Sequence, residues 1–176
     1  MKKILYVISV SLFIALLLTS CAPAFPEEID KENEQIKNLE GMSLSAVDFT
    51  DCKVDYYYYT FGYNKHLILG QMPANTVKKL IQCLKEAEIS SELDKDYIAV
   101  DGNEGNPAFR IILNTDEVIY ISCDDEFYNP NVIWINGDLC QCDDETISKL
   151  RDWAVTSTPG LKNYLNFLHL ESEGKI

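Results

Sequence analysis

Two cysteines, Cys140 and Cys142, are separated by one residue in a stretch with the pattern of a β-strand. Residues two apart in a strand point to the same face, so the two thiols are expected side by side. Such a pair could bind a soft metal, but zinc needs about four ligands, and the chain has only two histidines, His66 and His169. Cys123 is expected on the same face but two strands away, roughly 10 Å at the usual strand spacing. A structural role is favoured over a metal or redox site.

The chain has six cysteines. Five of them follow Cys21: Cys52, Cys83, Cys123, Cys140 and Cys142. An odd number cannot all pair within one chain, and exported proteins keep disulfides only in an oxidising compartment. We predict mostly free, buried thiols that act as small apolar side chains. A cysteine nucleophile would need a histidine as its base, and no sequence pattern places the two together.

Four consecutive tyrosines occupy positions 56–59. In a strand they put two rings on each face. One pair is expected in the core, and the other could form an exposed stacking platform for a sugar or a peptide. Packing of the four tyrosines in the core and on the surface is favoured over a binding platform.

Three acidic clusters lie at 101–104, 124–126 and 143–145. The first resembles the start of a calcium loop, but the EF-hand pattern places Gly sixth and Glu twelfth, where this chain has Asn106 and Ile112. We interpret the clusters as a turn, a solvated loop and a helix cap. No nucleophile-elbow or phosphate-loop sequence is present, so no catalytic residues are assigned.

Strand patterns are predicted at 44–50, 53–60, 66–70, 97–100, 108–113, 118–123, 131–135 and 138–142. Asn136-Gly137 is a strong hairpin signal. A two-residue turn there pairs Ile135 with Asp138, Trp134 with Leu139 and Ile133 with Cys140. The strand before this turn is apolar on both faces and is expected to be central.

Three helices are expected between and after these strands. The first begins near Pro73 or Asn75, with Asn75 as a suitable N-cap. Its apolar stripe is Val77, Leu80, Ile81, Leu84 and Ala87, with Lys78, Lys79, Lys85 and Glu86 off the stripe. The second begins at Asp143 or Asp144, and the third covers 161–168. The order predicts an α+β fold, a mostly antiparallel sheet with two to three helices packed on it.

The start of the chain has the features of an export signal. Two lysines precede an apolar run over 4–18, which is shorter than the roughly 20 residues that span a bilayer. The run ends in Leu18-Thr19-Ser20-Cys21. These four residues resemble the lipobox of bacterial lipoproteins. The resemblance implies a diacylglyceryl group on the Cys21 thiol and cleavage between Ser20 and Cys21. A plain secreted protein and a retained signal anchor are the alternatives.

Cleavage would leave 156 of the 176 residues, with 13 Lys and Arg against 28 Asp and Glu. Such an acidic chain is a poor partner for nucleic acid or anionic lipid head groups. We expect a signal peptide over 1–20, an acidic tether over 21–42 and a single domain over 43–176. From Pro73 onward, the order of elements is similar to that of small α+β domains in uncharacterised cell-surface lipoproteins, a resemblance without a diagnostic motif.

Three functional hypotheses follow for a protein held by lipid on Cys21 at the extracytoplasmic face of the cell membrane. The first is a non-catalytic binding or interaction domain, with a cell-envelope protein or a small ligand as its partner. The second is a ligand- or metal-binding domain that uses the tyrosine strand or the Cys140 and Cys142 face. The third is a thiol-dependent enzyme. No cofactor and no nucleic-acid partner is predicted.

The anchor is tested by Cys21→Ala. Because this variant has no thiol to acylate, it should leave the membrane fraction or accumulate as the uncut precursor. Cell fractionation and mass spectrometry of the mature N-terminus measure both outcomes. Unchanged retention and processing would contradict the lipid anchor.

Overall fold

The computed structural model describes residues 26–40, 42–60, 65–92, 108–123 and 129–155. These residues form an α+β fold with an eight-stranded antiparallel sheet and two helices, which confirms the predicted fold class. Several predicted features lie outside the described residues: Cys21, the strand at 97–100, the loops at 101–104 and 124–126, and the helix at 161–168.

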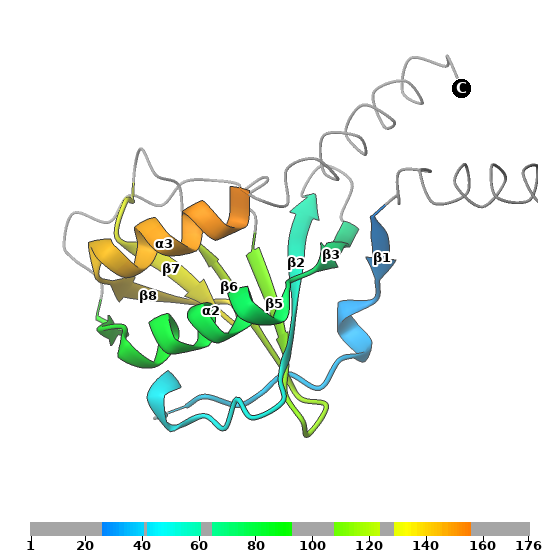
Figure 1. Cartoon of the computed structure of the whole chain (residues 1–176), viewed down its shortest axis with the longest axis horizontal. Helices are drawn as coiled ribbons and strands as arrows, with labels where there is room; N and C mark the ends of the chain where they lie inside the picture. The colour runs from blue at the N-terminus through cyan, green and yellow to red at the C-terminus, as the bar shows by residue number, and fades with distance from the viewer. Residues whose placement is uncertain (1–25, 41, 61–64, 93–107, 124–128, 156–176) are drawn as a thin grey trace, which may run out of the picture.

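The sheet order is β1-β3-β2-β5-β6-β7-β8-β4 (Figure 1). In chain order the strands are β1 (Glu27–Ile29), β2 (Lys53–Thr60), β3 (Lys65–Gln71), β4 (Ile89–Ser90), β5 (Ala108–Ile112), β6 (Val118–Cys123), β7 (Val132–Ile135) and β8 (Asp138–Cys142). The helices are α2 (Ala74–Glu86) and α3 (Asp144–Val155), with short 3-10 turns η1 (Lys31–Asn33) and η2 (Leu44–Ala46).

The hairpin of β7 and β8 has the predicted register, with Ile135 opposite Asp138 and Ile133 opposite Cys140. Its two turn residues, Asn136 and Gly137, have positive φ angles of 55° and 102°. Both central residues of a type I′ turn need this conformation, which asparagine and glycine tolerate best. The Asn136 side chain also accepts a hydrogen bond from the Tyr120 backbone N–H at 2.8 Å.

The strand predicted at 44–50 is wrong. This stretch begins with η2, where the Ser43 hydroxyl accepts a hydrogen bond from the Ser45 backbone N–H at 3.3 Å. Further along, the Asp48 carboxylate accepts one from the Thr50 backbone N–H at 2.9 Å. Short polar side chains that bond nearby backbone in this way compete with strand pairing.

The helix caps agree only in part with the predictions. Pro73, not Asn75, is the N-cap of α2, and its carbonyl accepts from the Val77 N–H at 3.0 Å. The acidic cluster at 143–145 does cap α3, because the Asp143 carboxylate accepts from the Thr146 backbone N–H at 2.8 Å.

Both helices lie on one face of the sheet, where they cover the main core (Figure 1). Phe109, Ile119 and Ile133 on the strands are fully buried there, as are Leu80 of α2 and Leu150 of α3. The helices therefore leave the opposite face of the sheet to be covered by other parts of the chain.

Part of that opposite face is covered by residues 26–40, which were expected to belong to a loose acidic tether. β1 pairs with β3 at the sheet edge, and Ile29 packs against the buried cluster around Tyr120. Farther on, the Lys37 backbone N–H donates to the Val118 carbonyl at 2.9 Å. The ordered domain therefore begins well before residue 43.

A charged cluster holds this segment against the sheet. Asp55, Arg110 and Tyr120 are direct neighbours across β2, β5 and β6. The Arg110 guanidinium donates to Asp55 at 2.7 Å and to Glu34 at 2.8 Å, and the Tyr120 hydroxyl also donates to Glu34. The Arg110, Asp55 and Glu34 side chains are 13–17% exposed. Glu34 thus supplies a carboxylate that the buried arginine needs, which explains why so polar a segment packs.

Replacing Arg110 with alanine should lower the free energy of unfolding by about 3 kcal/mol, because two nearly buried carboxylates lose their counter-charge. Urea denaturation measures this loss. Lys149→Ala is the matched control, since it breaks an exposed ion pair with Glu145 within one helix and should cost about 0.5 kcal/mol or less. Equal losses in the two variants would show that the cluster does not hold the fold together.

Candidate functional site

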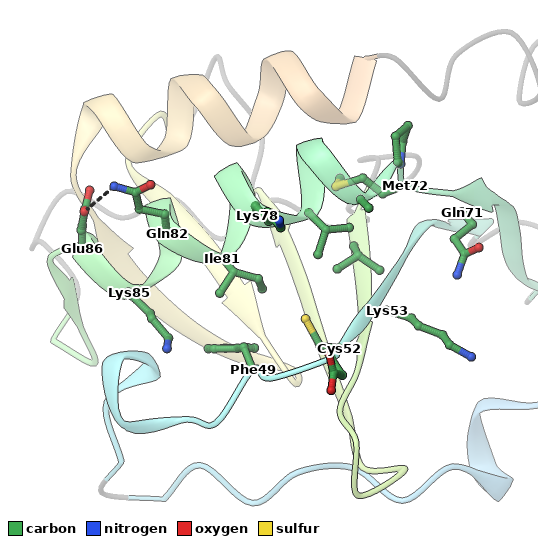
Figure 2. A pocket seen from close by; sticks show the side chains of 15 residues that line it. Phe49, Cys52, Lys53, Gln71, Met72, Lys78, Ile81, Gln82, Lys85 and Glu86 are labelled. Atoms are coloured by element: carbon green, nitrogen blue, oxygen red, sulfur yellow. Dashed lines mark hydrogen bonds between the residues drawn. The ribbon is translucent and has the colours of Figure 1, made fainter.

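A groove of about 820 Å³ lies between α2 and the segment that leads into β2 (Figure 2). Its apolar lining comes from both sides and consists of Phe49, Val54, Met72, Val77 and Ile81. Its charged and polar lining includes Lys53, Lys78, Lys85, Gln82 and Cys52. The groove thus combines an apolar floor with a polar rim.

One wall is a single face of α2. Val77, Ile81 and Lys85 recur at intervals of four residues, so they follow one another along the helix. Leu80 and Leu84 point to the core and are 0% and 1% exposed. The apolar stripe predicted from sequence is therefore divided between the core and the groove.

The other wall depends on the tight turn at 48–52. Asp51 has a left-handed φ of 54°, and the Cys52 backbone N–H donates to the Phe49 carbonyl at 3.3 Å. This turn buries the Phe49 ring and leaves Cys52 half-buried beside it (Figure 2). The Lys85 ammonium lies 5.7 Å from the centroid of the Phe49 ring, so the side chains of the two walls are in contact.

Burial raises the pKa of all five cysteines and so disfavours their thiolate forms. Cys83, Cys123 and Cys142 are buried, Cys52 and Cys140 are half-buried, and all five are unpaired, as predicted. Burial raises the pKa of Cys123 to about 11 and that of Cys142 to about 12. The pKa of Cys52 is also raised, chiefly by burial, although Lys85 acts in the opposite direction.

The predicted geometry of the cysteine face is confirmed. Cys140 and Cys142 both lie on the helix-covered face of the sheet. Cys123 is opposite Ile133, which is opposite Cys140, so Cys123 and Cys140 are two strands apart. Within the described ranges, no group of three or more His, Cys, Asp or Glu side chains is arranged to hold a metal ion.

The tyrosine strand does not offer the exposed platform that we considered. Tyr57 and Tyr58 are buried, and Tyr56 and Tyr59 are half-buried. The Tyr57 hydroxyl is hydrogen-bonded to Nδ1 of His66, and the Tyr59 ring stacks on the same imidazole with the centroids 4.7 Å apart. In the described part of the chain, His66 makes no hydrogen bond to a thiol.

A second groove, of about 840 Å³, lies between residues 37–40 and 42–44 on one side and the β7–β8 turn on the other. Lys37, Glu40, Asp138 and Cys140 are among its lining residues. Its lysine already forms an ion pair with Glu117 at 2.9 Å. This groove therefore offers fewer available charged groups to a ligand than the groove beside α2.

None of the protein-family models, curated proteins or solved structures compared with this chain matches it. Among the described helices, none has the length and apolar character needed to cross a bilayer. The function is therefore inferred from the geometry of the chain's own residues.

Sequence reasoning did not find the groove. It placed Lys78 and Lys85 on the solvent side of α2 and Lys53 in a strand, without bringing them together. The spacing of seven residues between Lys78 and Lys85 was a usable signal, since it corresponds to two helical turns on one face. The contribution of Lys53 depends on tertiary structure.

The thiols can be ranked by alkylation with iodoacetamide at neutral pH. Cys52 and Cys140 should react before the three buried cysteines, and all five more slowly than an unstructured peptide thiol with a pKa of about 8.5. Peptide mass spectrometry measures the rates, and unfolding in urea should make the five alike. A thiol that reacts faster than the peptide in the folded protein would revive the enzyme hypothesis.

Proposed function

We propose that this protein is a bacterial lipoprotein, anchored through Cys21 at the extracytoplasmic face of the membrane, whose α+β domain binds a small ligand without catalysis. The residues Leu18 to Cys21 support the anchor. The groove beside α2 supports the binding role, and it is the single observation that carries this part of the proposal.

The size and lining of the groove suit a small molecule. Ligand sites in proteins are concave, commonly about 300–1,000 Å³ in volume, and mostly apolar with a few polar groups that orient the ligand. The groove has a volume of about 820 Å³. Its apolar lining includes Phe49, Val77 and Ile81, and its polar lining includes lysine and glutamine side chains.

The pKa of Cys52 and the position of His66 favour binding over catalysis. Cys52 is the thiol in the groove, and its pKa is raised rather than lowered. His66 is held between tyrosines on the other face of the sheet. An activated nucleophile needs a lowered pKa or an adjacent base, and the described residues of the groove provide neither.

Photo-crosslinking tests the groove directly. The mature lipid-bearing protein, in phosphatidylcholine vesicles, is irradiated with the neutral probe 4-benzoylbenzamide, and the modified residues are mapped by mass spectrometry. Modification should concentrate at 49–54 and 74–86. Ile81→Trp should reduce it at least about fivefold, because the indole fills the apolar floor and about 1 kcal/mol of lost contact changes binding by this factor.

Lys79→Trp is the matched control, since Lys79 is an exposed residue of α2 that does not line the groove. This variant should retain the wild-type pattern. Thermal unfolding verifies that both variants fold. Modification spread evenly over the surface, or equal loss in both variants, would contradict a binding site in the groove.

A further inference from the structure

We infer that the ligand of the groove is a small organic anion with an apolar body, whose negative charge is attracted by the lysines of the lining, Lys53, Lys78 and Lys85. This inference rests on the proposed binding function and specifies the chemical class of the ligand. It is carried by three lysines without carboxylate partners that line the groove, and by the apolar side chains beside them.

Of the eight lysines in the described residues, three have a carboxylate partner. The chain has 28 Asp and Glu against 15 Lys and Arg. Lys37, Lys65 and Lys149 form ion pairs at 2.9, 2.9 and 2.6 Å. Within the described residues, Lys53, Lys78 and Lys85 have no carboxylate within ion-pair distance, and neither do Lys31 and Lys79, which lie outside the groove. The ammonium groups around the groove therefore keep their capacity to bind an added anion.

The lysines flank the groove from both walls. Lys53 begins β2, whereas Lys78 and Lys85 lie two turns apart on α2, about 10 Å along the helix axis. In Figure 2, Lys85 points toward Phe49 at one end of the lining, and Lys53 extends away from Cys52 at the other. The lining carboxylates are Asp51 and Glu86, and Glu86 already accepts a hydrogen bond from Gln82 at 3.0 Å. The lining therefore has more positive than negative groups in a chain with a net charge of −13.

The apolar lining of the groove indicates that the anion has an apolar body. The half-buried Val77 and Ile81 present apolar surface to the groove beside the buried Phe49 and Met72, and a small hydrated anion such as phosphate would leave that surface wet. An apolar body attached to the acidic group removes this surface from water, which is favourable in proportion to its area. An acidic peptide satisfies the charge as well, but the volume of about 820 Å³ matches small-molecule sites.

The experiment compares two probes that share one apolar body. The mature protein in phosphatidylcholine vesicles is crosslinked with 4-benzoylbenzoate, which is anionic, and with 4-benzoylbenzamide, which is neutral. The carboxylate should label 49–54 and 74–86 half-maximally at about one-tenth of the amide concentration, a difference of about 1.4 kcal/mol. Raising the salt from about 0.05 M to 0.5 M should reduce this advantage, because exposed charges are screened.

The variant Lys53→Gln/Lys78→Gln/Lys85→Gln should lose the preference for the carboxylate and keep labelling by the amide. Lys79→Gln is the matched control, because it removes the neighbouring lysine of α2 outside the groove, and it should keep the preference. Retention of groove labelling by the amide in the triple variant shows that the groove is still folded.

The outcomes separate this inference from the proposed function. Equal labelling of the groove by both probes in the wild type would overturn the anion preference and leave the binding function standing. Labelling of the groove by neither probe would overturn both. A third arm uses an acidic tripeptide with a central benzoylphenylalanine. If this peptide labels the groove at lower concentration than 4-benzoylbenzoate, the occupant is a peptide and the inference fails.

Discussion

An antiparallel sheet has two faces, and the apolar side chains on both must be kept from water. Here α2 and α3 cover one face, while the other carries Arg110 at its centre, in line with Asp55 and Tyr120. A nearly buried guanidinium needs more than one acceptor. Glu34 supplies the second, and it brings the segment at 26–40 with it. The ionic cluster therefore holds this cover on the second face together with the apolar contacts of Ile29.

The groove follows from how the chain enters the sheet. Had residues 44–50 formed a strand, they would have extended the sheet. Instead η2 and the turn at 48–52 fold back beneath α2, with Phe49 packed into the core. The space between this turn and the outer side of α2 is the groove. The same local hydrogen bonds that prevent a strand thus create the most suitable binding site among the described residues.

Local signals in the sequence were sufficient where the structure is local. Asn136-Gly137 determined the β7–β8 register, and helical spacing identified the buried face of α2. Local signals failed where the interacting residues are far apart in the sequence. Glu34 meets Arg110 across 76 positions of the chain, and the low apolar content around it indicated a tether. Lys53 and Lys85 were read correctly as a strand and a helix residue, but only the packing of α2 on the sheet places them on one groove.

The docking of β1 also limits how far the domain can move if Cys21 is acylated. Six peptide units separate Cys21 from Glu27, the first residue of β1, and a fully extended chain covers at most about 22 Å over that length. A tether ending at residue 43 would have reached about 79 Å. Because the accessible volume grows with the cube of the reach, the domain would sample roughly fiftyfold less space. It would meet only what diffuses close to the lipid surface.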